Sequence, residues 1–276
     1  MHTDNPGVSR RYYDLVNEYR QADFFFLSFP KCGRTWVRYT LGTYFHLVFG
    51  VNKTHKLNST HVARMAERRN QGCPLVSFTH DYFSLGDRIT KTEFQKVESN
   101  IKDFVFKDFY TAKPTVVLFR DPIDAVVSFY YHDINSKKPL GLSMEEWFKN
   151  ETFGLTGTLK WFDIAFALLD HLPKKLVLSY ENLKQHQGWE QLIKFTTNNY
   201  KPDLLKQSLE ENKFENAQAK EKQNRQTVVT NNNKLFVRQG GSNYEENLPQ
   251  EIKGYIDSID YLKTVRNKLS RIYETN

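Results

Sequence analysis

One short segment of the chain holds the residue types that bind anions. Residues 29–36 read Phe-Pro-Lys-Cys-Gly-Arg-Thr-Trp; an apolar run precedes them and an apolar-periodic segment, 36–49, follows. This order predicts a buried strand, a tight loop and a helix. A loop that enters a helix presents unpaired backbone N–H groups and the positive end of the helix dipole. Because Lys31, Arg34 and the Thr35 hydroxyl lie in the same place, we expect this loop to bind a phosphate or a phosphosulfate.

A second segment combines an arginine with helix-capping residues. Residues 120–132 read Arg-Asp-Pro-Ile-Asp-Ala-Val-Val-Ser-Phe-Tyr-Tyr-His and follow another apolar run. Asp121 can cap a helix, and Pro122 suits its first position, which by itself explains most of these residues. Arg120 then lies at the strand end, where a planar guanidinium can hold a phosphate through two hydrogen bonds. Ser128 lies two turns into the helix and faces a ligand only if that ligand lies along the helix.

Three further segments carry weaker signals, each of which also fits an ordinary turn or core position. Thr79-His80 ends an apolar run, and a histidine there could act as general base for a hydroxyl group. Residues 179–184 read Ser-Tyr-Glu-Asn-Leu-Lys after a fourth run, and residues 236–241 place an arginine beside two glycines that permit close backbone approach to an anion. The other seven histidines occupy no comparable position, and no spacing suggests metal ligands.

The elements that position these residues follow a regular order. Apolar runs predict strands at 24–29, 75–79, 115–119 and 175–179, and helical patterns lie at 36–49, 122–135, 158–172 and 189–199. Buried strands separated by helices predict a single α/β domain over residues 1–276, with a central parallel sheet flanked by helices. Ligands of such sheets bind at the carboxyl ends of the strands, so the Lys31 loop, His80, Arg120 and Tyr180 should share one rim. A polar segment at about 212–247 predicts a flap.

Composition limits the alternatives. The 276 residues carry a formal charge of +7, from 39 Lys and Arg against 32 Asp and Glu, and this modest excess is spread along the chain. It suits a small polyanionic ligand as well as it suits nucleic acid. Cys32 and Cys73 give no disulfide framework, which favours a reducing compartment. No apolar stretch approaches the ~20 residues of a membrane span, so we expect a soluble, cytoplasmic protein.

Other chemistries at the first loop remain open. The loop is not a Walker A motif, because Lys31 precedes Gly33, and no carboxylate for magnesium is evident, which disfavours a small-molecule kinase. Cys32 and Arg38, with five residues between them, resemble the signature of cysteine-dependent phosphatases, in which a helix N-terminus lowers the pKa of the thiol. The bulk of Trp36 fits that loop poorly. A non-catalytic, basic nucleotide or nucleic-acid binder is a further alternative.

Taken in order, the motifs resemble those of the soluble sulfotransferases that use 3′-phosphoadenosine-5′-phosphosulfate. Residues 29–36 are similar to the Y/F-P-K-[SA]-G-T-T-W loop of that family, and residues 120–132 match R-[ND]-P-x-D-x-x-V-S-x-Y-x-H at every fixed position. Thr79-His80 matches the family's T-H pair, and residues 180–184 match Y-E-[DN]-L/M-K. Residues 238–240 match the family's R-K-G loop in part. The resemblance implies a P-loop-like nucleotide-binding core and transfer of a sulfuryl group to a hydroxyl or amine, with no metal.

The resemblance also implies a role for each matching residue. Lys31 would stabilise the leaving nucleotide, 3′,5′-bisphosphoadenosine, His80 would deprotonate the acceptor, and Ser128 would bind the 3′-phosphate with Arg120. The implied nucleotide contacts are Lys31, Cys32, Gly33, Arg34, Thr35, Trp36, Arg120, Ser128, Tyr180, Phe214, Arg238, Gln239 and Gly240; the implied catalytic side chains are Lys31, His80 and Ser128. Among these, Trp36 and Phe214 would enclose the adenine.

The sequence departs from the family pattern at several positions. Cys32 and Arg34 replace small hydroxyl residues, Phe78 replaces a lysine two residues before the histidine, and Gln239 replaces the lysine of R-K-G. The dimer motif of vertebrate members is absent, and these differences look bacterial rather than animal. The acceptor stays open among sugars, lipids, phenols and peptides, because aromatic residues such as Phe29, Phe83 and Trp161 suit an apolar pocket and a core equally. The oligomeric state is open too.

Overall fold

A sheet of parallel strands forms the centre of the protein. The computed structural model describes residues 18–52, 67–80, 112–136, 139–213, 216 and 244–274. Its strands are β1 (Phe24–Ser28), β2 (Val76–Thr79), β3 (Thr115–Phe119) and β4 (Lys175–Ser179). They pair in parallel in the order β2-β1-β3-β4, so the predicted parallel sheet is confirmed. The two central strands are buried at every residue, which explains why their sequences are apolar without alternation.

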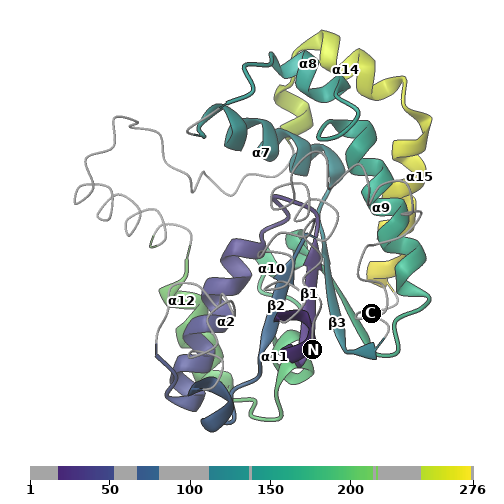
Figure 1. The fold of residues 1–276 in the computed structure, drawn as a ribbon. Coiled ribbons are helices and arrows are strands. Elements are labelled where there is room, and N and C mark those ends of the chain that lie inside the picture. The colour runs from purple at the N-terminus through teal and green to yellow at the C-terminus, as the bar shows by residue number, and fades with distance from the viewer. Residues whose placement is uncertain are drawn as a thin grey trace, which may run out of the picture.

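Helices cover both faces of this sheet (Figure 1). The helices before and after the sheet strands are α2 (Arg34–Phe49), α7 (Pro122–Ile134), α8 (Met144–Lys149), α9 (Leu155–Leu169), α10 (Tyr180–Lys184), α11 (Trp189–Thr196), α12 (Pro202–Glu211), α14 (Gln250–Asp257) and α15 (Asp260–Glu274), with a 3₁₀ turn η1 (Tyr244–Asn247). In Figure 1, α2 packs with α12 on one side, and α9 packs with α15 on the other. Helices α7, α8 and α14 lie beyond the carboxyl end of the sheet.

Local sequence signals set where the principal helices begin. Helix α2 starts directly after Gly33, which adopts a left-handed conformation with φ of 93°. Helix α7 starts at Pro122, and the Asp121 side chain accepts hydrogen bonds from the amides of Ile123 and Asp124 at 2.9 and 3.3 Å, as a helix cap does. The capping role predicted for Asp121 is therefore confirmed.

One helix begins a turn earlier than the sequence predicts. Helix α9 starts at Leu155 instead of residue 158, and Gly157 lies inside its first turn. A Cβ atom at Gly157 would lie 2.2 Å from the carbonyl oxygen of Thr152, so a glycine is required for this close packing. The glycine therefore permits a backbone approach here and does not break the helix.

The core contains many aromatic side chains. Phe29 packs edge-on against Trp161, with 5.7 Å between ring centroids, and Phe119 lies 5.3 Å from Phe162. Phe29 and Trp161 are both buried in this core, so these two of the three aromatic residues considered for an apolar acceptor pocket have a structural role. The third, Phe83, lies outside the described residues.

Candidate active site

The turn between β1 and α2 has an unusual backbone. Lys31 adopts a left-handed conformation with φ of 68°, and Gly33 has φ of 93°. A Cβ atom on Gly33 would lie 2.5 Å from the ring of Tyr180, so the turn approaches that ring as closely as only glycine allows. No side chain caps α2 and no acidic residue lies in its first turn, which leaves its N-terminal amides suited to an anion.

Arg120 joins this turn to the end of β3. Its side chain is buried, with 4% of the residue exposed, and its Nη1 atom donates a hydrogen bond to the carbonyl oxygen of Lys31 at 2.9 Å. The guanidinium lies over the Tyr180 ring, 4.4 Å from the centroid, and Nη2 is 4.0 Å from a carboxylate oxygen of Asp124. The structure thus brings together the loop predicted for one phosphate and the arginine predicted for another.

His80 faces the same turn from the end of β2. Its Nδ1 atom lies 2.7 Å from the carbonyl oxygen of Ser28, and because a carbonyl only accepts, Nδ1 carries the proton. In the neutral ring the lone pair is therefore on Nε2, the position that a general base requires. Burial lowers the pKa of His80 well below its ordinary value, and the positive charges of Arg34, Lys31 and Arg38 lower it further, against the hydrogen bond to Ser28.

Several cations surround the His80 ring. Lys31, Arg34 and Arg38 all act on the His80 ring through their charge, so three cations lie around one partly buried imidazole. Such a concentration of positive charge suits an anion that carries more than one negative charge. Lys31 and Arg34, two of the residues predicted to hold a phosphosulfate, thus act on the same ring. Thr35 is exposed at the start of α2, and its position leaves the hydroxyl accessible.

A second histidine, His132, also lies within the electrostatic influence of Lys31. Burial and the charge of Lys31 lower the pKa of His132 to about 4. His132 follows Ser128 by one turn on α7, and residues four apart share a helix face, so both partly buried side chains belong to the Lys31 side of α7. The charge of Lys31 thus acts on His132 as well as on His80, which the sequence did not indicate.

Aromatic residues form one wall of the site. The Trp36 ring packs edge-on against Trp189 and Tyr180, with centroid distances of 5.0 and 6.2 Å. Its Nε1 atom donates to the carbonyl oxygen of Asn212 at 3.0 Å. Trp36 remains partly exposed, so one part of the ring is available to a ligand. The sequence indicated Trp36 and Tyr180 but not Trp189, whose position emerges only when α11 packs beside α2.

Cys32 has the wrong environment for a nucleophile. The residue is 0% exposed and belongs to the apolar core, and its amide bonds to the Phe29 carbonyl at 3.4 Å. Burial raises the pKa of the thiol far above its ordinary value, and the positive charge of Arg120 opposes this only in part. A thiolate is the species that attacks phosphorus, so the burial of Cys32 argues against the cysteine-dependent phosphatase. Arg38, the other half of that signature, lies over the Phe78 ring at 5.6 Å.

Several predicted residues belong to parts of the chain that the structure does not describe. Phe214, Arg238, Gln239 and Gly240 lie outside the described residues, as does most of the predicted flap. Its described ends contact α2 and α7. Asn212 is buried and donates to the Thr43 hydroxyl at 2.9 Å, and the Tyr244 amide donates to Asp124 at 2.9 Å.

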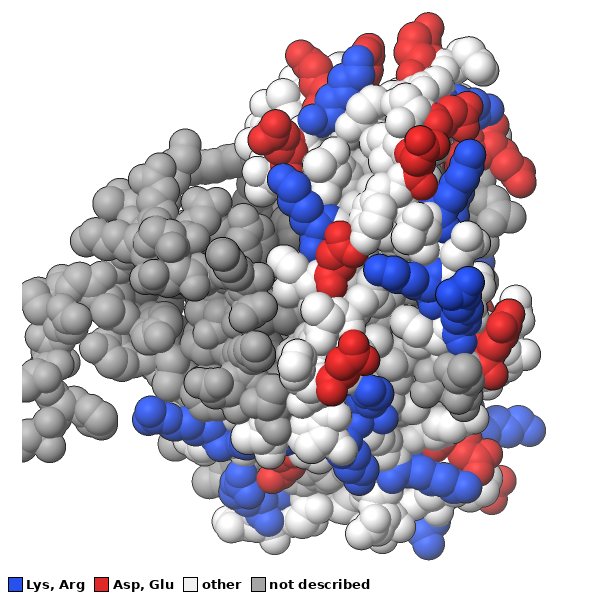
Figure 2. Space-filling view, turned by 90° about the vertical axis from the view of Figure 1, so that its right-hand side faces the viewer, with Lys and Arg blue, Asp and Glu red and all other residues white. Residues whose placement is uncertain are grey.

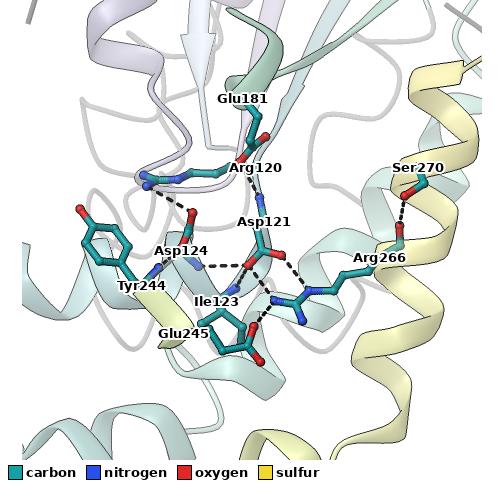
Figure 3. A network of polar contacts seen from close by, with 9 residues as sticks. All are labelled: Arg120, Asp121, Ile123, Asp124, Glu181, Tyr244, Glu245, Arg266 and Ser270. Carbon is teal, nitrogen blue, oxygen red and sulfur yellow. Dashed lines mark hydrogen bonds and ion pairs between the residues drawn. The ribbon is translucent and has the colours of Figure 1, made fainter. Parts of the chain in front are cut away.

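A polar network lies beside Arg120 (Figure 3). The backbone amide of Asp121 donates to Glu181 at 3.1 Å, and Glu181 also accepts from the Ser179 hydroxyl at 2.9 Å. From the other side, Arg266 of α15 reaches the Asp121 carboxylate. The segment after β4 and the C-terminal helix thus meet at the residue that follows Arg120. Sequence reasoning did not identify Arg266, because nothing in the pattern around it marks a site.

The face drawn in Figure 2 carries charges of both signs. In Figure 2, basic and acidic side chains lie side by side on the visible face, with no continuous basic stripe across the described part. Interspersed charges of both signs are typical of an ordinary solvated surface. Nor does any helix of the described ranges have the length and apolarity needed to cross a bilayer.

Comparison with known proteins identifies the family to which this chain belongs. A sequence profile of the family described as sulfotransferase domain matches residues 21–266, and the chain therefore belongs to this family. The chain is 28% identical over 190 residues to sulfotransferase 6B1 of Danio rerio, which covers 64% of the chain and 57% of that protein. Over 188 residues it is 26% identical to sulfotransferase 6B1 of Homo sapiens, covering 64% and 56%. The matched region thus spans little more than half the length of these relatives.

Solved structures share the fold at low sequence identity. The crystal structure of mouse sulfotransferase SULT7A1 complexed with PAP has a TM-score of 0.55 and 13% identity, covering 91% of this chain and 90% of that one. The crystal structure of retinol dehydratase in complex with androsterone and inactive cofactor PAP has a TM-score of 0.57 and 15% identity, covering 92% and 84%. The predicted family and the predicted α/β architecture are both confirmed.

Proposed function

We propose that this chain transfers a sulfuryl group from 3′-phosphoadenosine-5′-phosphosulfate to a hydroxyl or amine acceptor. The observation that carries the proposal is the arrangement of three groups at one rim: the turn at Lys31, the Arg120 guanidinium hydrogen-bonded to that turn, and the His80 ring beside it. Family membership and two structural neighbours complexed with PAP support the nucleotide.

The turn and the start of α2 are assigned to the 5′-phosphosulfate. The amides of Gly33, Arg34 and Thr35 lie at the N-terminus of α2, and Arg34 and Thr35 are the first two residues of that helix. Lys31 supplies a positive charge at the turn, where negative charge builds on the leaving phosphate oxygen. Cys32 contributes through the backbone of the turn, since its side chain faces the core.

Arg120 and Ser128 are assigned to the 3′-phosphate, and the aromatic wall to the adenine. Arg120 is already held against Tyr180 and the Lys31 carbonyl, so its guanidinium loses little conformational freedom when a phosphate binds. Trp36 lies against Tyr180 and Trp189 and offers its exposed part to the base. The proposed nucleotide contacts also include Phe214, Arg238, Gln239 and Gly240, which rest on the family resemblance alone.

The chemical step then needs one proton to be removed. The Ser28 carbonyl fixes the His80 tautomer, which leaves Nε2 as the atom that accepts the acceptor's proton. Burial and three nearby cations keep the ring neutral in the free protein. A bound anionic donor offsets those cations and raises the basicity of His80 at the moment when the base is used. The charge of Lys31 and the amides of α2 stabilise the negative charge that builds on the leaving nucleotide. No step is assigned to a metal ion.

Calorimetry tests the proposal directly. We expect 3′,5′-bisphosphoadenosine to bind more tightly than adenosine 5′-monophosphate, because only the former carries the 3′-phosphate that Arg120 would hold. Labelled donor with panels of sugars, lipids, phenols and peptides then identifies the acceptor class. Equal affinity for the two nucleotides, together with no transfer to any panel, would contradict the proposal.

A further inference from the structure

One side chain of the C-terminal helix reaches the start of α7. Arg266 donates from Nε to one carboxylate oxygen of Asp121 at 2.8 Å and from Nη2 to the other at 3.2 Å. Its Nη2 also donates to Glu245 of η1 at 2.6 Å (Figure 3). A planar guanidinium that holds two carboxylates in this way fixes their positions as well as their charge.

Asp121 is held on three sides as a result. Its carboxylate caps α7, its backbone amide donates to Glu181, and its two oxygens receive Arg266. Asp121 is bonded directly to Arg120, the residue assigned to the 3′-phosphate. The contacts of Arg266 therefore act on the backbone that carries Arg120, although Arg266 itself lies on the far side of Asp121 from that guanidinium (Figure 3).

The charges around Arg266 give it a second effect. A cavity of about 370 Å³ beside the network is lined by the carboxylates of Asp121, Asp124, Glu181, Glu245, Glu246 and Asp257 and by two cations, Lys253 and Arg266. Acidic groups thus outnumber basic ones next to the proposed 3′-phosphate site. If Arg266 is neutralised, the carboxylate of Asp121 keeps the two amides that it caps but loses its cationic partner, so its negative charge is left uncompensated one residue from Arg120.

We propose that Arg266 is a positioning residue for Arg120. It compensates the charge of the Asp121 carboxylate and holds this residue in place, so that no uncompensated negative charge next to Arg120 opposes the binding of the 3′-phosphate. The inference rests on the function proposed above, and it assigns Arg266 no contact with nucleotide or acceptor.

The test compares Arg266→Gln with Arg266→Lys and with a control on the same helix. Lys268→Gln is that control, because Lys268 pairs with Asp163, 4.0 Å away, and not with Asp121. Calorimetry gives the affinity of each variant for 3′,5′-bisphosphoadenosine and for adenosine 5′-monophosphate, and the ratio of the two isolates the 3′-phosphate. We expect Arg266→Gln to reduce this ratio by about tenfold, the size of coupling within one ionic network, and Arg266→Lys to reduce it less. Lys268→Gln should leave it unchanged.

A rescue variant separates positioning from a general structural role. In Arg266→Gln with Asp121→Asn, residue 121 can still cap α7, but its neutral amide adds no negative charge beside Arg120. We expect this double variant to recover most of the ratio lost in Arg266→Gln. A double variant as poor as Arg266→Gln, or an Arg266→Gln variant with the parent ratio, overturns the inference. A parent protein that does not distinguish the two nucleotides would instead contradict the 3′-phosphate site assigned to Arg120 in the proposed function.

Discussion

The Arg120 guanidinium donates a hydrogen bond to the backbone carbonyl of Lys31, with 2.9 Å between Nη1 and the oxygen. Lys31 has φ of 68°, a conformation that costs a non-glycine residue free energy unless its surroundings stabilise it. Arg120 therefore does more than supply charge at the end of β3. It also holds the turn that is proposed to bind the 5′-phosphosulfate, so the two proposed phosphate sites are mechanically linked.

Replacing Arg120 should weaken both sites unequally. In Arg120→Ala, the 3′-phosphate loses a charged partner, which we expect to reduce the affinity for 3′,5′-bisphosphoadenosine by about ten- to hundredfold. Affinity for adenosine 5′-monophosphate should fall by a smaller factor, because the Lys31 turn loses its anchor. Calorimetry with the two nucleotides measures both effects. If the affinities for the two nucleotides fell by the same factor, Arg120 would act only by holding the Lys31 turn and would not bind the 3′-phosphate.

Replacing His80 should separate turnover from nucleotide binding. His80→Asn retains a side-chain amide that can donate toward the Ser28 carbonyl but has no basic nitrogen, so we expect turnover to fall by about two to four orders of magnitude. Affinity for 3′,5′-bisphosphoadenosine should survive. His46→Asn is the matched control, because His46 also bonds through Nδ1 to a backbone carbonyl, that of Val51 at 2.7 Å, away from the site. Parent-like turnover in His80→Asn would remove His80 from the mechanism.

Replacing Cys32 tests whether the buried thiol takes part in the reaction. Cys32→Ala deletes a buried sulfur and should cost about 1 kcal/mol of stability, as small deletions in a core do. Sulfuryl transfer should remain near the parent rate, because the thiol faces the core and burial raises its pKa. Transfer assays and urea unfolding check the two statements. Complete loss of activity in a folded variant would restore the thiol to the mechanism.

Sequence predicted the sheet and the rim because both depend on local pattern. The strand at 115–119 and the strand at 175–179 have the predicted bounds, since continuous apolar runs end there at polar or capping residues. The turn at Lys31, Arg120 and His80 meet because parallel strands bring their carboxyl ends to one edge. Motif order then indicated the family without any knowledge of contacts.

The remaining features depend on contacts between distant segments. Nothing near Arg266 in the sequence indicates that it reaches Asp121, and Trp189 joins Trp36 only through helix packing. Helix α8 was not predicted, although Ser143 and Glu146 form a capping box that could have shown its start. The burial of Cys32 was unpredictable because a turn residue normally faces solvent, whereas this one points back into the core.

The low pKa of His132 predicts how stability depends on pH. His132 has a pKa of about 4 in the folded protein against an ordinary value of 6.5, so below pH 6.5 the unfolded chain takes up a proton that the folded chain does not. Stability should therefore fall as the pH falls from 6.5 toward 4. The stability of His132→Gln should fall less over this pH window. The titration of His80 lowers stability in the same direction in both proteins. Urea unfolding at about pH 7 and about pH 5 measures the difference, and parallel losses would contradict it.

Replacing Gly33 should damage the turn more than its backbone angle alone explains. In Gly33→Ala the new Cβ would lie 2.5 Å from the Tyr180 ring at a φ of 93°, so both a clash and backbone strain oppose folding. Gly72→Ala is the matched control, because Gly72 has φ of 69° and a Cβ added there would meet no atom within 4 Å, which leaves strain only. We expect Gly72→Ala to lose about 1 kcal/mol and Gly33→Ala to lose roughly 2–4 kcal/mol in urea unfolding. Nucleotide affinity should fall only in Gly33→Ala, because displacement of Tyr180 also removes the surface on which Arg120 rests. Equal effects of the two substitutions would mean that the contact between Gly33 and Tyr180 does not shape the site.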